Sequence, residues 1–190
     1  MKREKILSRL RQAAEERRIV ALQLKGRSWD ESVWPLRVSE TMVLCANDCD
    51  FQLNGWDAIA IDAIARVDFR YDRYGEFAAA DGLLESMRDP GYPVDNWQSF
   101  FASLPADHLV GVERRQAPEG EVTYAVGRVV KAGKKRVHLL CVDSEAIWEE
   151  APWRIRYADI NAVRVGDRYL TVFGKYAGEP EAQEATEDEV

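Results

Sequence analysis

Residues 59–67 read Ile-Ala-Ile-Asp-Ala-Ile-Ala-Arg-Val, and residues 155–163 read Ile-Arg-Tyr-Ala-Asp-Ile-Asn-Ala-Val. The two stretches share isoleucine at the first and sixth positions and valine at the ninth. Each is followed a few residues later by Asp-Arg-Tyr, at residues 72–74 and 167–169. Matches that share one offset and are followed by the same tripeptide indicate an internal repeat.

Two further pairs of segments match in the same order along the chain. Residues 19–22, Ile-Val-Ala-Leu, correspond to residues 109–112, Leu-Val-Gly-Val. Residues 43–46, Val-Leu-Cys-Ala, correspond to residues 139–142, Leu-Leu-Cys-Val. The sequence therefore predicts two copies of one small unit rather than a single large domain.

Each copy is predicted to be a helix followed by five short strands. In residues 1–17, Ile6, Leu7 and Leu10 lie on one face at helical spacing, and we expect this face to dock on its own domain. In the second copy, Asp95 and Gln98 resemble a capping box before residues 97–104. The predicted strands are 19–24, 33–38, 42–46, 51–61 and 64–70, then 109–114, 122–131, 136–142, 147–157 and 160–165, with 169–176 as a possible extra strand.

The predicted organisation has four parts. Residues 1–76 form the N-terminal helix and first barrel, residues 77–94 a helical linker, and residues 95–177 a helix and second barrel. Residues 178–190 hold six acidic and no basic residues, and we expect a disordered acidic tail. The fold class is mainly β with short helices, as two five-stranded barrels that each follow an α-helix.

This order of elements resembles the Sm-like small barrels, a subset of SH3-like folds. The resemblance rests on an N-terminal helix, five short strands and a one-turn break between strands four and five, at residues 61–64 and 157–160. It extends to a group of bacterial proteins of unknown function that carry the barrel singly or in tandem. The resemblance implies an interaction module that presents loops and edge strands to a partner.

RNA binding of the Sm type is not implied by the residues present. Residues 127–130, Gly-Arg-Val-Val, match the bent second strand of that family, and residues 35–38, Pro-Leu-Arg-Val, take the same place in the first copy. However, the following turns read Ser39-Glu40-Thr41 and Ala132-Gly133-Lys134, without the Asp and Asn pattern of an RNA-contacting turn.

Composition and charge limit the class of protein. The 190 residues include 26 Lys or Arg and 33 Asp or Glu, for a net charge of −7, and the tail supplies most of this acidity. No apolar stretch is long enough to span a bilayer, and the N-terminus lacks an apolar signal core. Three cysteines suit a reducing compartment, so we expect a cytoplasmic protein that does not bind membranes.

A basic hairpin in the second copy is the strongest local charge signal. Its residues are candidates for anion or nucleic-acid binding, and the alternatives are a solvated hairpin tip or a docking site for the acidic tail. The candidates are Arg114, Arg128, Lys131, Lys134, Lys135 and Arg136.

Two tryptophans in the first loop, Trp29 and Trp34, have no counterpart in the second copy and are candidates for partner binding. The alternative is that they fold back over the barrel. Trp56 and Trp153 fall at similar places in the two copies, and we expect both to close a barrel core.

The sequence gives no support for a catalytic or metal site. Cys45 and Cys141 fall at equivalent positions of the two copies, which favours core packing over metal binding. His138 points to the opposite strand face from Cys141, so the two do not predict a nucleophile and base. We therefore expect a non-catalytic interaction or adaptor module without cofactors, whose partner is a protein or peptide, and self-association is possible. The alternative is an RNA-binding regulator that uses the basic hairpin.

Overall fold

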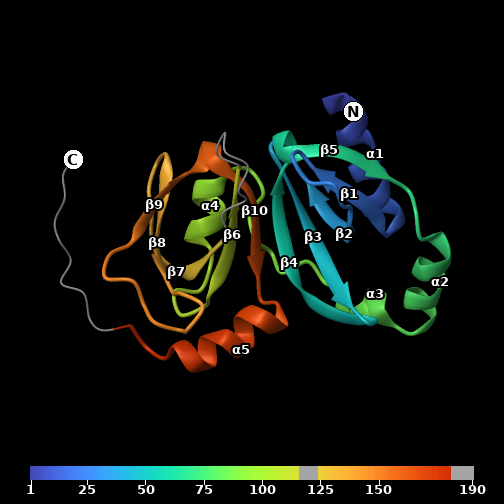
Figure 1. Cartoon of the computed structure of the whole chain (residues 1–190). Coiled ribbons are helices and arrows are strands. Elements are labelled where there is room, and N and C mark those ends of the chain that lie inside the picture. The colour runs from blue at the N-terminus through green and yellow to red at the C-terminus, as the bar shows by residue number, and fades with distance from the viewer. Residues whose placement is uncertain (116–123, 181–190) are drawn as a thin grey trace.

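The computed structural model describes residues 1–115 and 124–180, and within them ten antiparallel strands form one sheet (Figure 1). The strand order is β5-β1-β2-β3-β4-β10-β6-β7-β8-β9. The prediction of a mainly β fold with short helices is confirmed. The strands are β1 (Val20–Leu24), β2 (Glu31–Val38), β3 (Met42–Cys49), β4 (Gln52–Ala60), β5 (Ile64–Asp68), β6 (Val110–Arg114), β7 (Tyr124–Ala132), β8 (Arg136–Cys141), β9 (Trp153–Arg156) and β10 (Ile160–Val165).

The sheet has the same strand order in its two halves. In the N-terminal half, residues 1–87, the fifth strand β5 lies beside the first strand β1, followed by β2, β3 and β4. In the C-terminal half, residues 96–180, β10 lies beside β6, followed by β7, β8 and β9. A one-turn 3-10 helix separates the fourth and fifth strands in both halves, η1 (Ile61–Ala63) and η2 (Tyr157–Asp159), as the sequence predicts.

The two halves meet where β4 pairs with β10. Their register places Ala58 opposite Val163 and Asp57 opposite Arg164. The Asp57 carboxylate accepts two hydrogen bonds from the Arg164 guanidinium, both of 2.9 Å, and Asp57 is 2% exposed. This bidentate ion pair lies in the seam and holds one half against the other.

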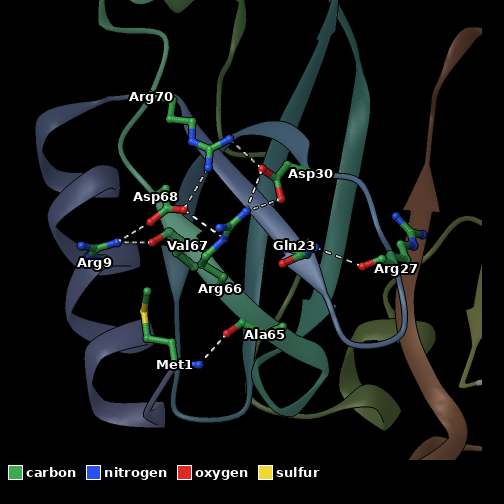
Figure 2. Close-up of polar contacts among 10 residues, drawn as sticks. All are labelled: Met1, Arg9, Gln23, Arg27, Asp30, Ala65, Arg66, Val67, Asp68 and Arg70. Atoms are coloured by element: carbon green, nitrogen blue, oxygen red, sulfur yellow. Dashed lines mark hydrogen bonds and ion pairs between the residues drawn. The ribbon is translucent and has the colours of Figure 1, made fainter.

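Helix α1 (Arg3–Glu16) packs against β2 and β5 of its own half, so the predicted docking is confirmed. Ile6, Leu7 and Leu10 are buried in the main core. Figure 2 shows that α1 also reaches the outer edge of β5, where the Met1 backbone nitrogen donates to the Ala65 carbonyl oxygen at 2.8 Å.

Arg9 of α1 makes the second contact with this edge. It donates to the Val67 carbonyl oxygen and to the Asp68 carboxylate, the latter at 2.8 Å (Figure 2). Carbonyl groups on the outer side of an edge strand are available for pairing with another strand. In this protein Met1, which precedes α1, and Arg9 of α1 occupy two of them.

Helix α4 (Trp97–Ala102) lies inside the C-terminal half and packs against β7 and β8. Its Phe100 and Phe101 side chains are fully buried. The N-cap is Asn96, whose side-chain oxygen accepts a hydrogen bond from the Ser99 backbone at 2.9 Å. The predicted capping box at Asp95 and Gln98 is therefore wrong by one residue.

Two predicted segments differ from the structure. Residues 169–176 lie in helix α5 (Arg168–Ala177) rather than in a strand, because the Asp167 carboxylate caps the helix by accepting from the Leu170 backbone nitrogen at 2.6 Å. The linker 77–94 is helical only in part, in α2 (Asp72–Ala80) and α3 (Leu83–Ser86). Gly82, with φ of +78°, separates these two helices.

The last ten residues of the predicted tail, residues 181–190, lie outside the described residues. Gly178 and Glu179 are described and contact Arg128. None of the helices in the described parts of the chain has the length and apolar character needed to cross a bilayer.

Candidate anion-binding surface

The β7–β8 hairpin ends in a tight turn with lysines at its tip. The Gly133 backbone nitrogen donates to the Arg136 carbonyl oxygen at 2.9 Å, which places Lys134 and Lys135 between the two strands. Lys134, Lys135 and Arg136 are all exposed. The turn therefore directs three cationic side chains toward solvent.

Basic side chains continue from this tip across three neighbouring strands. The register places Lys131 opposite His138 and His138 opposite Arg154, while Arg136 lies opposite Arg156. Residues opposite each other on adjacent strands share one face of a sheet. Val137, Leu139 and Ile155 alternate with them and are buried, so the basic residues lie on the outer face.

We call the outward-facing residues Lys131, Lys134, Lys135, Arg136 and His138 the cationic face. Within residues 1–115 and 124–180, its lysines and Arg136 take part in no ion pair. Arg156, at its border, binds the Asp159 carboxylate through hydrogen bonds of 2.7 and 3.0 Å. The cationic face thus keeps a positive charge that the described chain does not neutralise.

The pKa of His138 reports this positive charge. Burial lowers the pKa of the imidazole below its ordinary value, and the charges of Arg154, Lys131 and Arg136 lower it further. A bound anion would oppose the charge effect and stabilise the imidazolium. The pKa of His138 should therefore rise when an anion binds to this face.

The structure divides the six sequence candidates into two groups. Lys131, Lys134, Lys135 and Arg136 lie together on the cationic face. Arg128 is 13% exposed and donates to the Glu179 carboxylate at 2.6 Å, and Arg114 is half-buried at the end of β6. Arg114 and Arg128 are thus less accessible to a partner than the other four.

Sequence reasoning omitted His138, Arg154 and Arg156 from the basic group. Arg154 and Arg156 come from β9, which follows a long segment without regular strand structure between residues 143 and 152. The alternation of basic and apolar residues in Arg154-Ile155-Arg156 could have indicated an outward-facing basic edge. Only the register shows that these residues lie beside His138.

The two loop tryptophans do not form a paired binding site. Trp34 is 3% exposed, and its indole nitrogen donates to Asp48 at 2.9 Å, so it belongs to a core cluster with Ile19 and Ala46. Trp29 is 56% exposed, and the Arg27 guanidinium lies 5.3 Å from the centre of its ring. Burial by helices α2 and α3 explains why Trp34 is unavailable to a partner.

The expected match between Trp56 and Trp153 is also wrong. Trp56 pairs with Ala46 of β3, and in the C-terminal half Val142 forms a bridge with Trp148. Because residues 43–46 correspond to residues 139–142, Trp148 takes the place of Trp56. Trp153 instead lies at the sheet edge and is 38% exposed.

The cysteines and buried carboxylates occupy structural positions. Cys45 and Cys141 are buried in the main core, and burial raises the pKa of the Cys141 thiol to about 12. Glu113 is 4% exposed and is bound by Arg27, and Asp57 is bound by Arg164. These two carboxylates are engaged by arginines rather than directed into an open cleft.

The protein was compared with family models, with curated proteins and with solved structures. No family model, no curated protein and no solved structure matches the chain.

Proposed function

We propose that this chain is a non-catalytic binding module of two SH3-like or Sm-like barrels that holds a polyanionic partner on its cationic face. The identical strand order of the two halves supports the two-barrel architecture, as do the 3-10 turns η1 and η2 between the fourth and fifth strands. The proposed compartment is the cytoplasm, where the three free cysteines would remain reduced.

The observation that carries the proposal is the gathering of basic side chains on one outer face, where Lys131, His138 and Arg136 lie beside the lysines of the hairpin tip. Arginines elsewhere in the described chain are mostly paired with carboxylates, among them Arg9, Arg18 and Arg66. Like charges on adjacent strands destabilise a sheet. A basic cluster whose lysines and Arg136 form no ion pair with residues 1–115 and 124–180, in a chain of net charge −7, is therefore best explained by a binding role.

The proposal is tested by reversing the charge at the hairpin tip. The variant Lys134→Glu, Lys135→Glu, Arg136→Glu should elute from a heparin column at lower salt than the unmodified protein, because fewer counterions are released on binding. A matched control carries Lys5→Glu, Lys25→Glu and Lys175→Glu, which are exposed elsewhere and give the same change in net charge. Equal elution of the two variants would contradict the proposal.

A further inference from the structure

In the N-terminal half, an extended segment of the chain already lies along the β2–β3 hairpin. Residues 88–95 contain no helix or strand. The Trp56 indole nitrogen donates to the Arg88 carbonyl oxygen at 3.3 Å, and Arg37 pairs with the Asp89 carboxylate at 3.2 Å. Arg37 also donates to the Tyr92 carbonyl oxygen.

The same segment then continues to the tip of the hairpin. The Ser39 hydroxyl donates to the Val94 carbonyl oxygen at 2.6 Å, and the Thr41 hydroxyl donates to the Asp95 carbonyl oxygen at 2.8 Å. Trp56, Arg37 and the two hydroxyls at the tip therefore bind successive groups along residues 88–95. The bound segment runs from Trp56 past Arg37 toward the tip.

The C-terminal half has the tryptophan and the arginine at equivalent positions. Arg37 lies opposite Leu44 in the register, and Arg128 lies opposite Leu140, the residue that corresponds to Leu44. Trp148 replaces Trp56, as described above. The two halves thus present the same pair of donors beside the equivalent hairpins.

These donors again bind the segment that follows a helix. The Trp148 indole nitrogen donates to the Ala177 carbonyl oxygen at 2.8 Å. Arg128 donates to the Glu179 carboxylate at 2.6 Å and to the Gly178 carbonyl oxygen at 3.4 Å, and its guanidinium lies 5.2 Å from the Trp148 ring centre. The order from tryptophan to arginine repeats that of the N-terminal half.

The halves differ at the hairpin tip. The N-terminal half offers the Ser39 and Thr41 hydroxyls to carbonyl oxygens. In the C-terminal half the hairpin is longer: Lys131, opposite His138, takes the place of Ser39, which bonds to Met42, and Lys134 and Lys135 lie beyond it at the tip. Hydroxyls suit a neutral backbone, whereas ammonium groups suit carboxylates. The equivalent surface therefore has donors at the positions that hold an extended chain in the N-terminal half, and a charge that fits an acidic chain.

We propose that the cationic face binds an extended acidic polypeptide segment of a partner protein, laid along the β7–β8 hairpin as residues 88–95 lie along the β2–β3 hairpin. This inference rests on the proposed binding function and names the class of its partner. Carboxylates of the segment would pair with Lys131, Lys134 and Lys135. Arg128 and Trp148 mark the end of the surface that the chain's own residues 177–179 occupy.

The test measures the fluorescence anisotropy of labelled deca-glutamate at low salt in the presence of the full chain. Binding should be about tenfold or more weaker for Lys134→Glu, Lys135→Glu, Arg136→Glu, because three exposed charge pairs become repulsive. Binding should be unchanged for Lys5→Glu, Lys25→Glu, Lys175→Glu. The His138 ring signal in NMR should shift with the peptide, which places binding on the cationic face.

Two further measurements distinguish an acidic partner from the other molecules that could bind the cationic face. If labelled deca-uridylate binds and is lost in the hairpin variant while deca-glutamate does not bind, the partner is a nucleic acid, and this inference fails while the proposed function stands. If deca-glutamate binds only a variant that ends at Pro180, the acidic residues 181–190 are the occupant, and the assignment to a partner is overturned. If neither probe binds any variant, the proposed function fails as well.

Discussion

At the residue scale, the seam between the halves depends on buried charge. Asp57 and Arg164 form a bidentate pair, and this pair raises the pKa of Arg164 because the guanidinium is stabilised by the Asp57 carboxylate. The sequence could predict that both positions lie on strands. It could not predict their pairing, because residues 57 and 164 belong to different copies and no local pattern relates a fourth strand to the fifth strand of the other copy.

Removing one member of this pair should destabilise the fold strongly. Asp57→Ala removes the carboxylate that accepts both hydrogen bonds from Arg164 and leaves Asp167, 3.9 Å away, as its acidic neighbour. Because the Arg164 side chain is 35% exposed, we expect a loss of about 2–3 kcal/mol, below the value of about 3–5 kcal/mol for a fully buried pair. Asp159→Ala, which removes the partner of the exposed Arg156, should cost less than about 1 kcal/mol. Urea unfolding followed by tryptophan fluorescence compares the two variants. Equal losses would show that the seam pair does not contribute more than a surface pair.

At the element scale, the β7–β8 hairpin combines a predictable turn with an unpredictable surface. Gly133 and the adjacent lysines identify the turn from sequence, and four of the six anion-binding candidates do lie together. Strand β9 adds Arg154 and Arg156 to this surface only because of its register with β8. Residues 143–152 separate the two strands, and nothing in that segment predicts which side chains of β8 and β9 become neighbours. Residues 169–176 could not be assigned from sequence for a different reason. A short aromatic segment is compatible with a strand and with a helix, and the helix cap at Asp167 that decides between them is seen only in the structure.

The pH dependence of this hairpin follows from His138. Its pKa is lowered in the folded protein, so the folded state favours the neutral imidazole. The corresponding stability is present above the ordinary pKa of about 6.5 and is lost as pH falls below it. Arg136→Gln should raise the His138 pKa by removing one of the positive charges, as measured by NMR titration of the ring. An unchanged pKa would show that the hairpin charge does not reach His138.

At the scale of the whole molecule, the repeat predicts two similar units but not that they share one sheet. Gly55 of β4 shows how closely they approach. It has φ of +80°, and a Cβ atom there would lie 2.5 Å from the Val165 carbonyl oxygen and 2.6 Å from the Asp167 backbone nitrogen. Main-chain atoms cannot move aside as a flexible side chain can.

Gly55→Ala should therefore lower the free energy of unfolding for two reasons, backbone strain and the clash with the other half, and a control variant separates them. Gly91→Ala is the matched control, because Gly91 also has a positive φ, of +86°, but no atom within 4 Å of an added Cβ. The control should lose about 1–2 kcal/mol from the left-handed conformation alone. Gly55→Ala should lose more, as measured by urea unfolding. Similar losses would mean that the two halves can adjust at the seam without cost.

The contacts of α1 with β5 have a consequence for self-association. Copies of a protein that join head to tail through sheet edges need an accessible strand at both ends, and such a contact propagates into filaments unless it closes into a ring. Here β5 and β9 are the two end strands, and Arg9 occupies the Val67 carbonyl oxygen at the β5 end. The two ends of the sheet thus differ: two carbonyl groups at the β5 edge are already occupied, so we expect head-to-tail joining of β9 of one copy to β5 of the next to be disfavoured.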